Sequence, residues 1–222
     1  DDADDLALVK LGALKKEFVV EADANTFDID IYANSAFHIE RINQADWISL
    51  TCGETEDGKG AITAECEFNE GFKRKAGFVL CSDVDARRDT VYVKQKALVD
   101  AKIEFANSSV IVAGAGGENI SPIETNIPFS EITVDIEYAK ADNADWIESL
   151  EIVDSESENR SLAITTEANA ADEIPRSATV SLSFTDGWDE TVSVEFNLLQ
   201  RTAKETLGRQ ITFEEFRQTY AM

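Results

Sequence analysis

The sequence contains little of what several protein classes depend on. Its 222 residues include only 3 cysteines, 3 prolines and 1 histidine. No apolar run approaches the roughly 20 residues that a membrane-spanning helix requires. Basic residues are also scarce, because 20 lysines and arginines stand against 44 acidic residues. The resulting net charge of -24 repels phosphate backbones and anionic lipids, so we expect no nucleic-acid partner.

The cysteines are too few and too irregularly spaced for a complete disulfide framework or a recognisable metal motif. They are Cys52, Cys66 and Cys81. Strand alternation gives Cys66 the same phase as Ile62, whereas Cys81 is out of phase with its neighbour Leu80. We therefore expect no bridge between Cys66 and Cys81, and interpret a buried cysteine here as a small apolar residue.

What the sequence does contain is a repeat. Ala-Asp-Trp-Ile at 45–48 recurs at 144–147, and each half ends in a strand that closes on a glutamine, Gln95 or Gln200. Two more matches keep the same order: Ala-Ile-Thr at 61–63 with 163–165, and an Arg-x-Ala-x-x-x-Leu pattern at 74–80 with 176–182. A β-sandwich domain needs about 100 residues, and 43% of this chain is hydrophobic, which is enough to fill two cores. The repeat therefore predicts two similar domains.

Alternation of apolar and polar residues predicts the class of fold. Segments 27–31 and 132–136 alternate with a period of two, which is typical of strands with one wet face. Asp57-Gly58 and Asp186-Gly187 are turn signals between strands. No helical period appears before residue 205. We therefore expect an all-β chain of two tandem immunoglobulin-like antiparallel β-sandwiches with a short C-terminal helix.

The expected domains are 1–97, with an acidic N-terminal tether, 98–201, and a helical tail at 202–222. Residues 113–128 have no evident counterpart in the first half and are interpreted as an insertion. The tail carries a capping-box pattern, Thr212 with Glu215, and an apolar face that includes Phe216. We expect the tail to begin a further domain or to dock on the second one.

Both halves carry the same landmarks in the same order: Ala-Asp-Trp-Ile, an alternating strand, the Arg-to-Leu strand and a closing glutamine, Gln95 or Gln200. In these landmarks, both halves resemble the BACON domain (Bacteroidetes-associated carbohydrate-binding often N-terminal). The family implies an immunoglobulin-like sandwich in exported proteins of Bacteroidota. The tail at 211–217 resembles the opening of a further domain in their surface lipoproteins. The resemblance thus implies an outer-membrane or cell-surface lipoprotein, held by a lipid anchor ahead of Asp1, with a polysaccharide or host glycan as partner.

Glycan binding would use an exposed aromatic ring flanked by hydrogen-bonding side chains. Trp188 is our candidate, with Asp186 and Asp189 beside it at a predicted hairpin tip. Trp47 and Trp146 occupy equivalent positions in the repeat, which favours a role as packing anchors.

We expect no catalytic residues, no cofactor and no metal. The only histidine, His38, has no nucleophile placed beside it by a recognisable motif, and is interpreted as an ordinary strand residue. The acidic groups Asp142, Asp145 and Glu148, and the run 154–158, lack the regular alternation of a calcium loop, so we interpret them as a solvated face. The predicted function is a non-enzymatic spacer and glycan-binding unit; the alternative is a protein-protein interaction platform in a surface complex.

Overall fold

The computed structural model describes residues 8–140, 145–153, 160–170 and 174–202. These residues form strands, turns and one short 3-10 helix, η1 (Phe129–Glu131), and they include no helix that could cross a membrane. The predicted all-β class is confirmed, while the predicted C-terminal helix lies outside the described residues. The chain divides into two compact units, Asp1–Asp100 with Thr185–Glu190, and Ala101–Phe184 with Thr191–Met222.

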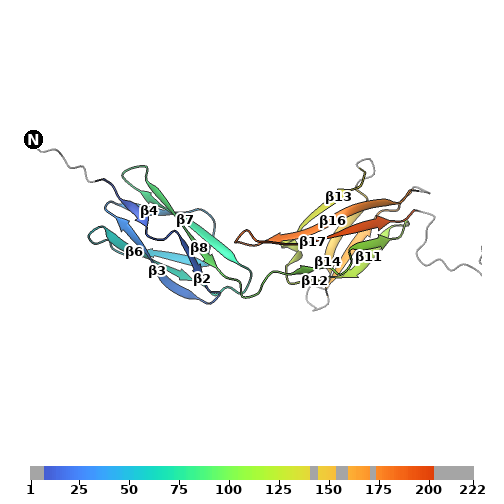
Figure 1. Cartoon of the computed structure of the whole chain (residues 1–222), viewed down its shortest axis with the longest axis horizontal. Coiled ribbons are helices and arrows are strands. Elements are labelled where there is room, and N and C mark those ends of the chain that lie inside the picture. The colour runs from blue at the N-terminus through green and yellow to red at the C-terminus, as the bar shows by residue number, and fades with distance from the viewer. Residues whose placement is uncertain (1–7, 141–144, 154–159, 171–173, 203–222) are drawn as a thin grey trace, which may run out of the picture. The chain divides into compact units, whose positions relative to one another are not determined.

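The first unit is an immunoglobulin-like sandwich of two four-stranded sheets, ordered β1-β3-β6-β5 and β2-β8-β7-β4 (Figure 1). All neighbouring strands are antiparallel except β2 and β8, which are parallel. The strands are β1 (Leu11–Ala13), β2 (Glu17–Val20), β3 (Asn25–Ala33), β4 (Phe37–Arg41), β5 (Ile48–Cys52), β6 (Lys59–Cys66), β7 (Arg74–Ser82) and β8 (Arg88–Gln95).

Alternation along these strands builds the core of the first unit. In β7, Phe78 and Leu80 point inward and are fully buried, as is Ile62 of β6. The predicted turn at Asp57-Gly58 is confirmed: both residues have positive φ, 50° and 74°, and the turn joins β5 to β6. A glycine fits the second position because it adopts this backbone conformation without steric cost.

The second unit repeats this plan. Its sheets are ordered β10-β17-β16-β13 and β11-β15-β14, and a two-stranded sheet pairs β12 with β9. The parallel pair β10 and β17 matches β2 and β8. The strands are β9 (Ile103–Glu104), β10 (Ser109–Val112), β11 (Gly117–Pro122), β12 (Glu124–Thr125), β13 (Thr133–Tyr138), β14 (Ile147–Val153), β15 (Ser161–Thr166), β16 (Arg176–Thr185) and β17 (Thr191–Gln200).

The interpretation of 113–128 as an insertion is wrong. Strand β11 lies in this segment and pairs with β15 along its whole length, just as β3 pairs with β6 in the first unit. The segment therefore supplies a regular strand of the sandwich rather than an added loop.

One match in the predicted repeat is also displaced by two residues. Cys66 pairs with Ile48, which follows Trp47, and Thr166 pairs with Ile147, which follows Trp146. Cys66 and Thr166 are therefore equivalent, so Ile62 corresponds to Leu162 and not to Ile164. Aligning residues 61–63 with 163–165 kept inward residues opposite inward residues, but it displaced the two strands by two residues, which is one full period of a β-strand.

Candidate functional site

In the first unit, Arg74 at the start of β7 contacts two other residues of the repeat, Trp47 and Gln95. We call these three residues, and their equivalents in the second unit, the lock. The guanidinium of Arg74 lies 4.5 Å from the ring centre of Trp47, and its Nε donates a 2.8 Å hydrogen bond to Gln95 Oε1. The amide of Gln95, which is completely buried, donates to the backbone oxygens of Ala22 at 3.1 Å and Glu67 at 2.9 Å. These bonds tie β8 to the chain entering β3 and leaving β6.

The second unit builds the same lock from equivalent residues. Arg176 lies 5.0 Å from the ring centre of Trp146, and its Nε donates to Gln200 Oε1 at 2.6 Å. The buried amide of Gln200 donates to the backbone oxygens of Ala113 at 3.1 Å and Glu167 at 2.6 Å. In both units, the tryptophan is thus covered by an arginine, which is a packing arrangement and not an open platform.

Each lock has a further member that sequence reasoning missed. Asn69 donates from its side-chain amide to two backbone oxygens, and Asn169 does the same in the second unit. The signal was present in the sequence as Glu67-x-Asn69 and Glu167-x-Asn169. This shared pattern was missed because the preceding strand had been aligned two residues out of register.

The predicted sugar-binding turn is folded against the first unit, to which it belongs. Asp186 accepts hydrogen bonds from the backbone N–H groups of Trp188 and Glu190, and this closes the turn. The indole Nε1 of Trp188 donates to the Arg74 backbone oxygen at 3.2 Å, and the ring is half-buried. Asp189 pairs with Lys75 at 2.7 Å. Trp188 therefore presents only part of its ring to solvent.

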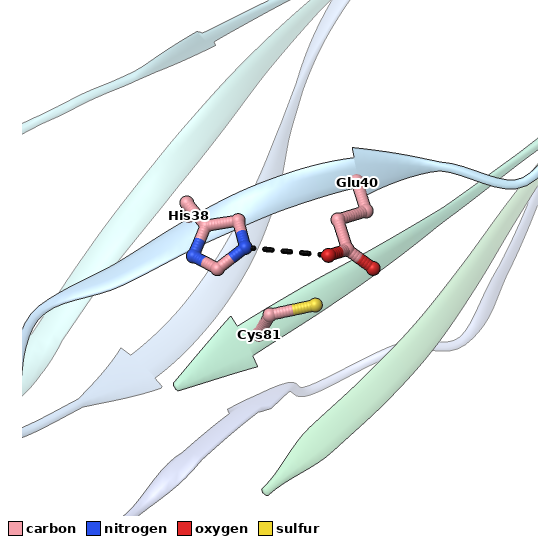
Figure 2. Close-up of side chains that lie close together, drawn as sticks. All are labelled: His38, Glu40 and Cys81. Carbon is pink, nitrogen blue, oxygen red and sulfur yellow. Dashed lines mark ion pairs between the residues drawn. The ribbon is translucent and has the colours of Figure 1, made fainter. Parts of the chain in front are cut away.

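A cluster of chemically active side chains lies elsewhere, on the outer face of the sheet β2-β8-β7-β4. His38 of β4 pairs directly with Cys81 of β7, and Cys81 pairs directly with Arg88 of β8. Since alternate residues share a face, Glu40 joins this row from β4. We call His38, Glu40 and Cys81 the β4–β7 cluster, and Figure 2 shows the three side chains converging above the sheet.

The distances within the β4–β7 cluster are short. His38 Nε2 lies 3.5 Å from Glu40 Oε1, and one ligand atom from each of the three residues falls within 4.8 Å of the others. On the opposite side of the ring, His38 Nδ1 lies 2.5 Å from the carboxylate of Asp83. Arg88 pairs with the other oxygen of Glu40, Oε2.

Hydrogen bonds and charge shift the ionisation of the exposed members. The carboxylate of Asp83, and then that of Glu40, raises the pKa of His38 above its usual 6.5. The hydrogen bond with Cys81, followed by that with His38 and the charge of Arg88, lowers the pKa of Glu40 below its ordinary value. Both shifts favour the charged forms.

Sequence reasoning did not find the β4–β7 cluster. The sequence placed Cys81 correctly on the face opposite Leu80, but it gave no neighbour for His38. In the structure, His38 lies directly opposite Cys81. Among the acidic residues that were interpreted as a solvated face and not as a calcium site, Asp142 and the run 154–158 lie outside the described residues. Among those described, the β4–β7 cluster is the set whose donor atoms lie close enough to hold one metal ion.

The chain matches no protein-family model and no curated protein. An endo-fucoidan hydrolase of glycoside hydrolase family 107 is 13% identical over 86% of this chain and 29% of that chain, with a TM-score of 0.26. A Bacteroides ovatus GH5 xyloglucanase is 16% identical over 49% of this chain and 22% of that chain, at 0.33. Tandem immunoglobulin domains of titin are 11% identical over 88% of this chain and 95% of that chain, at 0.29. The chain thus spans under a third of the two hydrolases, and these low similarities support no argument about activity.

Proposed function

We propose that this chain is a non-catalytic, BACON-like part of a larger exported surface lipoprotein, serving as a spacer that also binds glycan. The observation that carries the spacer role is the duplicated lock. The positions that the two units share, Trp47 with Trp146, Arg74 with Arg176 and Gln95 with Gln200, are engaged in packing and hydrogen bonds to the backbone. What has been duplicated is thus a way of closing a stable sandwich.

The surroundings of Cys81 favour a non-catalytic reading even though a histidine lies opposite. A cysteine nucleophile needs access to its substrate as well as a nearby base. Cys81 is only 3% exposed, because the neighbouring side chains cover it. His38 is oriented by Asp83, but the sulfur opposite it offers a substrate carbonyl little accessible surface.

Glycan binding would be carried by the partly exposed ring of Trp188 with Asp186 and Asp189. The test is a glycan array and affinity electrophoresis on the full chain, comparing the unaltered protein with Trp188→Ala. The matched control is Phe68→Ala, which removes a 43% exposed aromatic ring elsewhere on the first unit. Retention that Trp188→Ala loses and Phe68→Ala keeps supports glycan binding at the turn. Absence of retention by the folded protein leaves the spacer role alone.

The alternative role, a protein-protein interaction platform, is favoured by one feature of the second unit. Ile111 of the edge strand β10 and Leu199 of β17 are direct partners in the parallel pair and are 42% and 37% exposed. An apolar pair at a sheet edge can receive another strand. Loss of binding to surface proteins in Ile111→Lys would support this role, while unchanged binding would contradict it.

A further inference from the structure

The β4–β7 cluster has the donor atoms of a transition-metal site. It offers an imidazole nitrogen, a carboxylate oxygen and a thiol sulfur, a mixture that suits zinc, whereas calcium and magnesium prefer oxygen alone. We propose that His38 Nε2, Glu40 Oε1 and Cys81 Sγ bind one zinc ion, with the fourth position open to solvent. This site goes beyond the spacer role and does not depend on it.

The spacing of the donors fits tetrahedral coordination. Zinc bonds of about 2.0–2.2 Å to nitrogen and oxygen place two such ligands about 3.4 Å apart. His38 Nε2 and Glu40 Oε1 are 3.5 Å apart without a metal, and the sulfur falls within the same 4.8 Å group. Small side-chain rotations would complete the set, since His38 and Glu40 are both about half exposed.

Asp83 and Arg88 orient two of the ligands. In the neutral, metal-binding form of His38, Asp83 accepts the Nδ1 proton, and Nε2 then carries the lone pair on the side of Glu40 and Cys81. Histidine ligands of metals commonly have such a carboxylate partner on the other ring nitrogen. Arg88 holds Oε2 of Glu40, so that Oε1 is the oxygen facing the histidine. Asp83 and Arg88 are therefore positioning residues.

The charges are also consistent with a divalent ion. With Cys81 as thiolate and His38 neutral, as metal ligands require, the carboxylates of Glu40 and Asp83 and the sulfur carry three negative charges against the single positive charge of Arg88. The excess of two negative charges equals the charge of one zinc ion, whose attraction keeps a coordinating thiol deprotonated.

The second unit shows that the fold does not require these side chains. Leu80 pairs with Ile39, and its equivalent Leu182 pairs with Val134. The next pair in each register is His38 with Cys81 in the first unit and Thr133 with Ser183 in the second. Threonine and serine thus serve the same sandwich positions, so packing alone does not explain a histidine opposite a cysteine.

The test is cobalt substitution in the full chain, after chelation and reduction. Co²⁺ bound to a thiolate gives a charge-transfer band, and tetrahedral coordination gives intense visible bands. We expect both bands to saturate at one equivalent and to disappear when Zn²⁺ is added. Absence of the charge-transfer band in the unaltered protein would overturn the proposal.

The variants are chosen from the comparison of His38 and Cys81 with Thr133 and Ser183, their equivalents in the second unit. The double change His38→Thr and Cys81→Ser, which installs the second unit's residues, should abolish both bands while the circular dichroism spectrum is kept. Glu40→Gln should weaken binding, and Asp83→Asn should weaken it by about 10- to 100-fold. The matched control is Cys52→Ser, which removes an exposed thiol outside the cluster and should leave the bands unchanged. Bands that survive the double change, or binding by many equivalents without them, would show adventitious surface binding and contradict the site.

Discussion

At the scale of single residues, the cysteines differ in how readily they ionise. Burial raises the pKa of both Cys52 and Cys66, but Cys66 is the buried thiol and its pKa reaches about 11, whereas Cys52 remains exposed. At pH 8, only about one Cys66 thiol in a thousand is therefore ionised, and the thiolate is the reactive form. In native, metal-free protein, we expect iodoacetamide to modify Cys52 much faster than Cys66, as measured by peptide mass spectrometry. Equal rates in native protein would contradict the burial of Cys66; in denaturant the difference should vanish.

His38 is the only histidine, so its titration can be followed without ambiguity. Since Asp83 and Glu40 raise its pKa, we expect a value above 6.5 by NMR in metal-free protein, and a return toward 6.5 in Asp83→Asn. A raised pKa stabilises the fold fully below 6.5, and this contribution is lost as the pH rises through the folded-state pKa. Glu131→Gln, an exposed change on η1, is the control and should leave the titration unchanged. A pKa at or below 6.5 would contradict the ion pair with Asp83.

The sequence was sufficient to assign faces to these residues, but not neighbours. Alternation separated Cys81 from Leu80 and placed His38 on a strand. The meeting of His38 with Cys81 depends on the register of β4 against β7, and a period of two gives no information about register between strands far apart in the chain.

At the scale of strands and their junctions, the two locks should dominate stability. Gln95→Ala removes the acceptor of Arg74 Nε and one of the donors to the backbone oxygens of Ala22 and Glu67, and should lower the free energy of unfolding by about 1–3 kcal/mol. Gln200→Ala should have a similar effect in the second unit. Urea denaturation measures both. Gln44→Ala, at an exposed position, should change stability by less than about 0.5 kcal/mol. A loss no larger than that in Gln95→Ala would show that the lock contributes little.

Strand β11 was missed for a physical reason. Its inward positions carry polar side chains, Asn119 and a buried Ser121, which hydrogen-bond to each other at 3.2 Å. Its apolar Ile120 points outward and is 57% exposed. The alternation is thus inverted with respect to the core, and Pro122 is tolerated because β11 is an edge strand. Pairing with β15 outweighs the local pattern.

At the scale of the whole molecule, the repeat predicted the architecture because both units close with the same residues. It could not predict the β4–β7 cluster, since the second unit has Thr133 and Ser183 at the corresponding positions. Comparison of the halves therefore finds what the fold needs, while the differences between them indicate what is particular to one unit.

The net charge of -24 sets how the whole chain responds to salt. At about 10 mM salt, charges act over about 30 Å, and at 0.15 M over about 8 Å, so salt relieves the repulsion among 44 acidic residues. The opposing effect is the weakening of exposed ion pairs such as Lys102 with Glu124, each worth at most about 1 kcal/mol. Since acidic residues outnumber basic ones by more than two to one, repulsion should dominate, and calorimetry should show a Tm several degrees higher at 0.15 M. Neutralising the exposed Asp135, Glu137 and Glu151 as amides should raise Tm mainly at low salt; a Tm that falls with salt would mean that the ion pairs outweigh the repulsion.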